Sequence, residues 1–512
     1  MSALVALPLV YLVVRVFGGG GEGLTVLARA RTGELVAETA LLVGAVTAAA
    51  VLVAVPLAWL VTRTDIPGRR AWAVAAALPL VVPSYVAALA LLAAFGPTGL
   101  LQRLLEAPFG VERVPELYGL GGAVLALTIA TYPYVFLLTA VALREIDPAL
   151  EETARGLGRS SLAAFARVTL PLARPSIGAG ALLAALYTLS DFGAVSLMQA
   201  DSLTRAIFLQ YRSLFDRTPA AGLALVLVAL TAVVLTLELR ARGGGGYARL
   251  GAGTARAAAP VRLGRWQWPA LAFCGAVVAL ALGAPLAVLG YWFSRAASLD
   301  ALVDASRAAL NSVLASGSAA ALAVVAAIPV GFLAARHPAW WSRLLERLAY
   351  GANALPGIVI ALSLVFFAAR YASPVYQTLL LLVFAYVVRF FPQAVAASHA
   401  ALLAVSPRLD EAARGLGRGP RHAFASVTAP LVAPGLLAGA ALVFLSAMKE
   451  LPATLLLRPI GFDTLATEVW TATTVGSYSQ AAVPALLLVA LSAPLVYLLI
   501  ARGKAELSST GS

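Results

Sequence analysis

The sequence EETARGLGR at residues 151–159 returns almost unchanged as DEAARGLGR at residues 410–418, and this repeat decides how the chain is organised. Other residues keep the same spacing, namely Pro133 with Pro392 and Asp191 with Glu450. Nearer the amino terminus the spacing is slightly longer, and it relates Thr39 to Ser312, Arg63 to Arg336 and Pro83 to Pro356. Self-similarity at a fixed spacing is the signature of duplicated units, so we predict two homologous halves.

The change in spacing fits a longer loop in the first half (97–118) than in the second (370–376). We predict a first half over residues 1–240, a linker over 241–266 and a second half over 267–512. The linker contains Gly243–Gly246 and several arginines, which is typical of a flexible basic tether in the cytoplasm. We prefer this interpretation to a nucleic-acid site.

The composition indicates a membrane protein. Of the 512 residues, 61% are hydrophobic and only 12% are charged, and the mean hydropathy is +0.90. An ordinary soluble domain carries charge on about a quarter of its residues. A chain with so little charge cannot cover a surface that faces water, which excludes a soluble enzyme and a disordered chain.

About twelve stretches are apolar enough to form the roughly 20-residue helices that cross a bilayer. None alternates with the period of a β-barrel strand, so we predict an all-α polytopic membrane protein. Four of the stretches contain charged residues: Arg15, Asp191, Arg389, and the adjacent Lys449 and Glu450. The predicted spans are 2–17, 39–62, 71–102, 117–143, 175–200, 218–237, 266–294, 308–335, 348–369, 377–401, 435–457 and 469–501.

Six spans in each half give both halves the same orientation, so the repeat is parallel rather than inverted. The first span could instead be a signal peptide, but no basic segment precedes it and no cleavage site is obvious. We expect a retained first helix. With both termini in the cytoplasm, the cytoplasmic segments carry all of the excess positive charge and the external loops are almost neutral, as the positive-inside rule requires.

Chemistry carried by the chain itself is not expected. One cysteine and three histidines cannot form a disulfide within the chain or a zinc cluster, and no metal site is firmly assigned. The only lysines, Lys449 and Lys504, are followed by Glu and Ala, so no phosphate-binding GxxxxGK[ST] loop exists. No set of catalytic residues appears. We expect no enzyme activity and no bound cofactor, and any ATP and magnesium to be held by a partner subunit.

The repeated hydrophilic loops, 144–175 and 405–434, contain the signals of short helices. Asp147-Pro148 and Ser406-Pro407 each supply an N-cap residue followed by proline at the first helical position. Gly158 and Gly417 suit a left-handed stop after the first helix. We expect a second short helix to follow, ending at Pro171 and Pro430 before the next span.

The same loops resemble the EAA signature of importer permeases of the ATP-binding cassette (ABC) class. The matching residues are Glu152, Ala154, Gly158 and Pro171, and again Glu411, Ala413, Gly417 and Pro430. Departures are Thr153 for alanine, Val168 and Val427 for isoleucine, and Ala429 for leucine. The resemblance implies a type I ABC importer permease fold, in which each loop is a coupling helix that docks on an ATPase subunit. Two copies of that subunit would then bind.

Segments 186–194 and 448–459 are similar to the ferric-iron permease family of this class. That resemblance implies one fused chain that forms the whole channel in a bacterial inner membrane. It also implies an extracytoplasmic binding protein that delivers ferric iron. Thiamine, polyamine and phosphonate permeases are close relatives and remain alternatives for the cargo. A secondary transporter driven by protons or sodium is an alternative of another class.

Ionisable residues inside a span are costly and are candidates for function. Asp191 and Glu450 lie at corresponding positions, roughly 21 Å beyond the cytoplasmic loops at about 1.5 Å per helical residue. Their oxygens suit a hard cation such as ferric iron, and Tyr187 lies one turn from Asp191. Two hypotheses remain open. Asp191 and Glu450 line the translocation pathway with Tyr187, or they form structural ion pairs with Arg389 or Lys449.

Overall fold

The computed structural model describes residues 6–18, 25–96, 117–213, 218–241, 260–296, 299–337, 339–352 and 355–509, with isolated positions 99, 100, 102, 106 and 110. Most of the predicted linker, the start of the first predicted span and most of loop 97–118 lie outside these residues. Within the described part of the chain the regular elements are helices, apart from one isolated β-bridge between Thr64 and Val261. The predicted all-α fold is therefore confirmed.

The helices of the two halves follow one another in the same order, and a short π-helical turn precedes the fifth long helix of each half. The elements of the first half are α2 (Leu7–Gly18), α4 (Ala30–Arg63), α5 (Arg69–Ala77), η1 (Leu78–Val81), α6 (Ser84–Phe95), α8 (Leu120–Glu145), α9 (Pro148–Gly156), α10 (Ser161–Ala164), η2 (Phe165–Thr169), α11 (Leu170–Ser190), α12 (Gly193–Leu197), α13 (Leu203–Ser213) and α14 (Thr218–Ala241). Those of the second half are η3 (Gly264–Trp266), α15 (Gln267–Val278), η4 (Ala279–Gly283), α16 (Ala284–Ala296), α17 (Leu299–Arg336), α18 (Trp340–Gly351), α19 (Gly357–Tyr371), η6 (Ser373–Val375), α20 (Leu379–Ala404), α21 (Pro407–Gly415), α22 (Pro420–Ala423), η7 (Phe424–Thr428), α23 (Ala429–Met448), α24 (Pro452–Leu457), α25 (Leu465–Thr474) and α26 (Tyr478–Ser509).

Three long helices form the centre of each half: α4, α8 and α11 pack together in the first, and α17, α20 and α23 in the second. The predicted correspondences recur as the same hydrogen bonds. Arg63 donates to the carbonyl oxygen of Ile146 (2.9 Å), and Arg336 donates to that of Val405 (2.7 Å). Each arginine thereby satisfies a carbonyl just past the end of α8 or α20, where the helix leaves such groups unpaired.

The opposite ends of the long helices are also tied in the same way in both halves. Thr39 on α4 accepts a hydrogen bond from the Leu203 amide (3.0 Å), and Ser312 on α17 accepts one from the Leu465 amide (2.9 Å). These bonds hold the first turn of α13 and of α25. The duplication is therefore structural and not only a resemblance of loops.

The two halves interlock through their first helices. α2 packs on α14 of its own half and on α19 of the second half, whereas α16 packs on α26 and on α6 of the first half. The Arg15 guanidinium of α2 lies 5.3 Å from the centre of the Phe366 ring of α19. The charge in the first predicted span thus contacts an aromatic face of the other half.

Within the described residues, nine helices are long and apolar enough to cross a membrane, and a bent pair of helices makes a tenth. In the bent pair, the segments Arg69–Val81 and Ser84–Phe95 meet at 95°. The remaining two predicted spans correspond to the shorter apolar helices α2 and α19. A polytopic helical membrane protein is therefore confirmed, with nine or ten candidate spans among the described residues, whereas six spans in each half stays a prediction.

Five predicted spans are wrong as continuous helices. In the predicted span 71–102 the helix is interrupted before Pro83, and in 348–369 it is interrupted before Pro356. Proline lacks an amide hydrogen and disfavours helical geometry in the residue before it. The prediction 469–501 is divided at Gly476, which has a left-handed φ of 74°. Within the predicted spans 175–200 and 435–457, the helices end at Ser190, directly before Asp191, and at Met448, two residues before Glu450.

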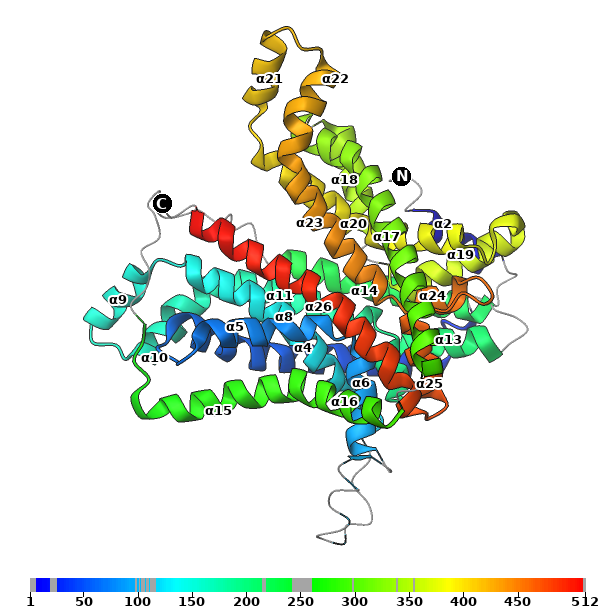
Figure 1. Ribbon diagram of the computed structural model, residues 1–512, viewed down its shortest axis with the longest axis horizontal. Helices are drawn as coiled ribbons and strands as arrows, with labels where there is room; N and C mark the ends of the chain where they lie inside the picture. Colours follow the sequence, from blue (N-terminus) through cyan, green and yellow to red (C-terminus); the bar gives the residue numbers. More distant parts are fainter. Residues whose placement is uncertain are drawn as a thin grey trace.

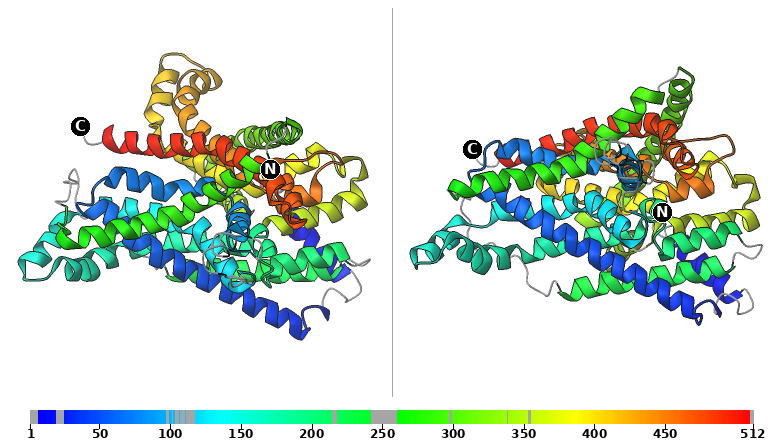
Figure 2. Two further views of the ribbon diagram at one scale, coloured as in Figure 1. Left: turned by 60° about the horizontal axis from the view of Figure 1, so that its bottom comes forward. Right: turned by 90° about the horizontal axis from the view of Figure 1, so that it is seen from below.

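The long helices of the two halves diverge, so the molecule has two arms (Figure 1). α9 and α10 lie at the end of one arm, and α21 and α22 lie at the end of the other. The arms meet at the opposite end, near α13, α24 and α25, and the views in Figure 2 agree with this arrangement. The repeated loops are therefore far apart, while the intramembrane acids lie where the halves converge.

Candidate functional site: coupling hairpins and an intramembrane charge cluster

Each repeated loop folds into a short helical hairpin. The Asp147 side chain accepts a hydrogen bond from the Ala149 amide (2.9 Å) and caps α9 as predicted, whereas the Ser406 side chain makes no capping bond to α21. Gly158 and Gly417 have φ of 86° and 82°, the left-handed stop predicted for both. The two hairpins thus share one turn and differ in their caps.

The predicted coupling residues occupy matching places in the hairpins. Glu152 and Glu411 are exposed on the first helix, while Ala154 and Ala413 are buried against the second. The carbonyl oxygens of Ala154 and Ala413 accept hydrogen bonds from the amides of Arg159 and Arg418 (3.3 and 3.2 Å), which closes each turn. The small alanine side chains allow the two short helices to approach each other.

One pair of hairpin residues was not predicted. Leu157 and Leu416 immediately precede the left-handed glycines, and their side chains are 80% and 83% exposed. A large apolar side chain that faces solvent in an otherwise polar turn is a candidate contact for a partner. The signal was present in the repeat, because both copies read Gly-Leu-Gly.

The expected end of the second short helix at Pro171 and Pro430 is wrong. α10, η2 and α11 form one continuous helix, as do α22, η7 and α23. The π-turns, Phe165–Thr169 and Phe424–Thr428, lie just before the prolines. A π-turn shifts the backbone bonds that a proline ring would otherwise block, so the helix continues. Each hairpin is therefore joined rigidly to a long helix of its arm.

The hairpins differ in how their two helices are tied. In the first half, Glu151 is buried and accepts a hydrogen bond from the Thr169 hydroxyl (3.0 Å). In the second half the corresponding acid is Asp410, whose side chain is one methylene shorter. Its carboxylate lies 3.8 Å from Arg414 of the same helix, and one of its oxygens has no hydrogen-bond partner.

The intramembrane acids do not lie within helices, in contrast to the predicted spans. Asp191 follows the last residue of α11, and Glu450 follows the last turn of α23. Each side chain caps the next short helix: Asp191 accepts a hydrogen bond from the Ala194 amide of α12 (2.9 Å), and Glu450 accepts one from the Ala453 amide of α24 (3.2 Å). A carboxylate is favoured there by the free amides at a helix start.

The second partner of each acid differs between the halves. The Ser84 hydroxyl donates a hydrogen bond to Asp191, and Tyr187 is also hydrogen-bonded to Ser84. Glu450 instead forms an ion pair with Arg389, whose Nε lies 2.8 Å from the carboxylate. Gly357 stands where the first half has Ser84, and a Cβ atom at Gly357 would lie 2.6 Å from Glu450 Oε1 and against the Arg389 guanidinium. Glycine thus leaves the space that Arg389 occupies.

The basic residues of this cluster connect the two halves. Arg389 also donates to the Ser190 hydroxyl of the first half (3.1 Å), and Lys449 donates to the carbonyl oxygen of Leu80 in η1 (2.6 Å). Lys449 and Glu450 follow the end of α23 at Met448 and so do not lie within one long helix, as the predicted span 435–457 would place them. Tyr187, Asp191, Arg389, Lys449 and Glu450 are therefore close together where the halves meet.

Chemically, this cluster holds two carboxylates and two cations in a low-dielectric environment, so each charge needs a partner. Each of the four has one in this conformation: a hydroxyl, a backbone amide, a carbonyl or an opposite charge. Among the residues that the structure describes, no group of three or more His, Cys, Asp or Glu side chains could hold a metal ion. The cluster therefore joins the two halves through hydrogen bonds from Arg389 and Lys449.

Comparison with known proteins identifies the family. The family model described as "Binding-protein-dependent transport system inner membrane component" matches residues 50–239 and 327–505. The chain is 33% identical to the Fe(3+)-transport system permease protein FbpB 2 of Haemophilus influenzae over 499 residues, which is 96% of this chain and 95% of that protein.

Shorter matches involve other permeases. The molybdenum transport system permease protein ModB of Escherichia coli K12 is 35% identical over 153 residues, which is 29% of this chain and 66% of that protein. The probable sulfate transport system permease protein cysT of Helicosporidium is 28% identical over 176 residues, 33% of this chain and 64% of that protein. The two matched segments, the duplicated helical halves and the match along almost the whole chain lead to one conclusion: the chain belongs to the family of binding-protein-dependent transport system inner membrane components.

Proposed function

We propose that this chain is the permease of an ATP-driven importer for ferric iron. The observation that carries the cargo is the 33% identity to a ferric-iron permease over 96% of the chain, whereas the molybdenum and sulfate permeases match about a third of it or less. An extracytoplasmic binding protein delivers the ion. The permease moves it inward by alternating access between the two halves.

Two copies of an ATPase subunit bind on this proposal, one to each hairpin. Support comes from the duplicated turn, from the exposed Leu157 and Leu416 side chains and from the unbroken helices that connect each hairpin to its arm. ATP and magnesium are held by the ATPase subunits, and this chain catalyses no covalent change. Closure of the ATPase pair draws the hairpins together, which closes the arms and opens the opposite end of the molecule.

Both termini and both hairpins lie in the cytoplasm in this proposal. The two-armed conformation is then open toward the cytoplasm, and the charge cluster closes the extracytoplasmic side. This assignment follows from the positive-inside rule, since basic residues are concentrated on the segments at the hairpin side.

Uptake in proteoliposomes tests the cargo. The permease is reconstituted with its ATPase and its binding protein, and uptake of labelled ferric ion, molybdate and sulfate is compared with and without ATP. Uptake of ferric ion that depends on ATP is the expected result. Uptake of an oxyanion alone would contradict the proposal, and uptake that persists without ATPase would indicate a secondary transporter.

Substitution of the exposed leucines tests the docking. Leu157→Glu together with Leu416→Glu places charge where an apolar contact is expected, so the ATPase no longer co-purifies with the permease. Leu172→Glu is the matched control, because Leu172 is also exposed (42%) but lies beyond the hairpin on α11. Retained ATPase binding by the double variant would overturn the assignment of these leucines.

A further inference from the structure

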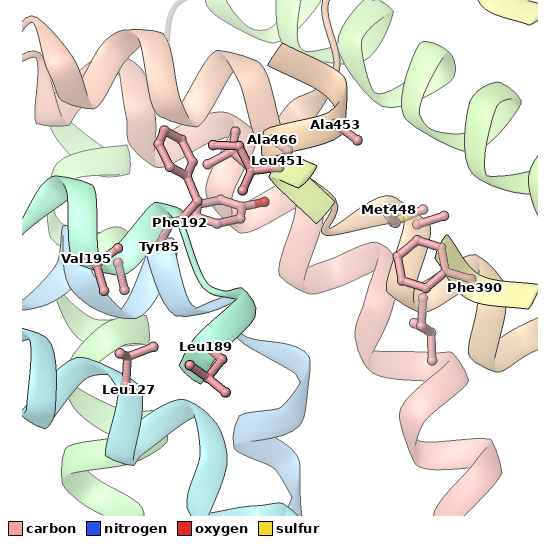
Figure 3. Packing of buried hydrophobic residues seen from close by; sticks show 14 of the residues in the cluster. Tyr85, Leu127, Leu189, Phe192, Val195, Phe390, Met448, Leu451, Ala453 and Ala466 are labelled. Carbon is pink, nitrogen blue, oxygen red and sulfur yellow. The ribbon is translucent and has the colours of Figure 1, made fainter. Parts of the chain in front are cut away.

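Tyr85 was not singled out by the sequence, yet it lies between the two halves beside the charge cluster. It is the second residue of α6, directly after Ser84, the hydroxyl partner of Asp191. A Cβ atom at Gly193 of α12 would lie 2.7 Å from Tyr85 Cβ and 3.2 Å from a methyl group of Leu451 in the second half. Figure 3 shows Tyr85 and Phe192 of the first half against Leu451 and Ala466 of the second.

The Tyr85 hydroxyl has an unusual environment. Its side chain is 3% exposed, and the hydroxyl oxygen is fully buried with no hydrogen-bond partner. A buried polar group without a partner is costly and is rare in native proteins. The ionisable groups that act on it are Tyr187 of its own half, and Tyr386 and Glu450 of the second half. The hydroxyl therefore belongs to the same cluster as the acids.

The acids and tyrosines of the cluster beside Tyr85 supply oxygens from both halves. Tyr187 and Asp191 belong to the first half, while Tyr386 and Glu450 belong to the second. Tyr386 is held by the Thr454 hydroxyl at 2.6 Å, and Glu450 caps the same helix, so these two oxygens are fixed relative to each other. Carboxylate and phenolate oxygens are hard donors, which hard cations select over nitrogen or sulfur.

We propose that Tyr85 is a ligand in a transient site for the transported trivalent cation, formed by phenol and carboxyl oxygens of both halves. The proposal rests on the proposed function, because a hard cation is the cargo that this donor set would recognise. The unpartnered Tyr85 hydroxyl is the donor that remains free while the protein is in the present conformation. A phenol that ligates the cation gives its proton to water.

Arg389 closes the site in the present conformation. Its guanidinium neutralises Glu450 and contacts Ser190, so the carboxylate is not available to a cation. A movement of the halves that separates Arg389 from Ser190 also frees Arg389 to leave Glu450. Cargo and Arg389 then compete for the same carboxylate, which couples the passage of the ion to the movement of the arms.

The variant Tyr85→Phe tests the proposal, and Tyr132→Phe is its matched control. Both hydroxyls are buried and unpartnered, and neither tyrosine is more than 3% exposed. Among the described residues, no ionisable group acts on the Tyr132 hydroxyl, in contrast to that of Tyr85. Each substitution removes one oxygen and breaks no hydrogen bond, so both variants should fold, which thermal unfolding of the purified proteins checks.

Ferric uptake is measured in proteoliposomes that contain the ATPase and the loaded binding protein. We expect Tyr85→Phe to lower the maximal rate by about tenfold or more, with an unchanged KM for the binding protein, since one ligand is lost from the site. Tyr132→Phe should match the wild type. A second measurement omits the binding protein and adds ferric nitrilotriacetate to the permease–ATPase complex trapped with vanadate. A visible phenolate-to-iron absorption is expected in the wild type and in Tyr132→Phe, and a weaker one in Tyr85→Phe.

The outcomes separate this inference from the proposed function. If the wild type imports ferric ion and Tyr85→Phe is as fast as Tyr132→Phe, with the same absorption, Tyr85 is no ligand and the inference is overturned. If the wild type imports no ferric ion, the proposed function fails and the inference fails with it. A slow Tyr85→Phe variant with reduced absorption supports both.

Discussion

The two halves of this molecule share the same arrangement of helices but stabilise their buried carboxylates with different partners. In both, a carboxylate follows a broken long helix and caps a short one. In the first half the Asp191 carboxylate accepts hydrogen bonds from the Ser84 hydroxyl and backbone amides, and in the second half Glu450 is paired with Arg389. Ala130 stands where the second half has Arg389, so the first half lacks the cation altogether.

The difference shows which parts of a duplicated transporter are free to diverge. The hydrogen bonds at both ends of the long helices and the left-handed hairpin glycines are the same in the two halves, because the fold of each arm depends on them. Where the halves meet, Glu450 of the second half is in an ion pair, whereas Asp191 of the first half has only neutral hydrogen-bond donors. Among the described residues of this cluster, the basic side chains of the second half donate hydrogen bonds to the first, from Arg389 to Ser190 and from Lys449 to Leu80.

The largest effect is expected from removing the cation. Arg389→Ala leaves the buried Glu450 carboxylate without its opposite charge and with only the Ala453 amide, which should lower the free energy of unfolding by about 3–5 kcal/mol. Ser84→Ala leaves Asp191 with its backbone amides and should cost about 1–3 kcal/mol. Denaturant titration in micelles measures both. Equal losses of stability in the two single variants would contradict the proposed difference between the halves. So would a double variant, Arg389→Ala with Glu450→Gln, that is no more stable than Arg389→Ala alone.

A smaller effect is expected when the serine of the first half is placed in the second. Gly357→Ser puts a side chain against Arg389 and Glu450, and overpacking of this kind typically costs about 1–3 kcal/mol. Adding Arg389→Ala to Gly357→Ser should remove the clash with the guanidinium and leave room for the Glu450 side chain to shift, so that the serine hydroxyl can donate to it. The measurement is again unfolding in micelles. Equal stability of Gly357→Ser and wild type would show that glycine is not required there.

A smaller change in stability is expected when the acids of the two hairpins, Glu151 and Asp410, are exchanged. Asp410→Glu supplies the methylene that lets the acid reach Thr428, as Glu151 reaches Thr169, and should stabilise the second hairpin by about 0.5–1.5 kcal/mol. Glu151→Asp should weaken the first hairpin by a similar amount. Amide hydrogen exchange in α9 and α21 reports both changes. Unchanged exchange in both hairpins would mean that this bond does not stabilise the loops.

The smallest effect concerns pH. Burial raises the pKa of Glu468 on α25, the Asp304 carboxylate raises it further, and Arg458 opposes both, whereas Ala206 holds the corresponding place on α13. A raised pKa in the folded state gives stability that is present below the unfolded pKa of about 4.3 and is lost as pH rises through the folded value. Glu468→Gln should flatten this dependence, which thermal unfolding across that range measures. A variant with the slope of the wild type would exclude Glu468 as its source.

Much of the architecture could be predicted because it depends on local properties. The duplication, the apolar spans, the hairpins and the left-handed glycines follow from repeated letters and from backbone rules that act over a few residues. The helix ends at Asp191 and Glu450 could not be predicted by hydropathy, since apolar residues continue on both sides of each acid. The π-turns before Pro171 and Pro430 were missed for a similar reason, because a proline in sequence does not say whether the helix stops or adapts.

The sequence by itself determined that this chain is a duplicated helical membrane protein with two matching loops, because composition and periodicity are local and additive. Only the tertiary structure decided which charges pair. Arg389 meets Glu450, Lys449 meets a carbonyl of the other half, and Tyr85 comes between the halves, although these partners are far apart in sequence or lie in different halves. Long-range contacts depend on how whole helices pack and break, and no short stretch of sequence contains that information.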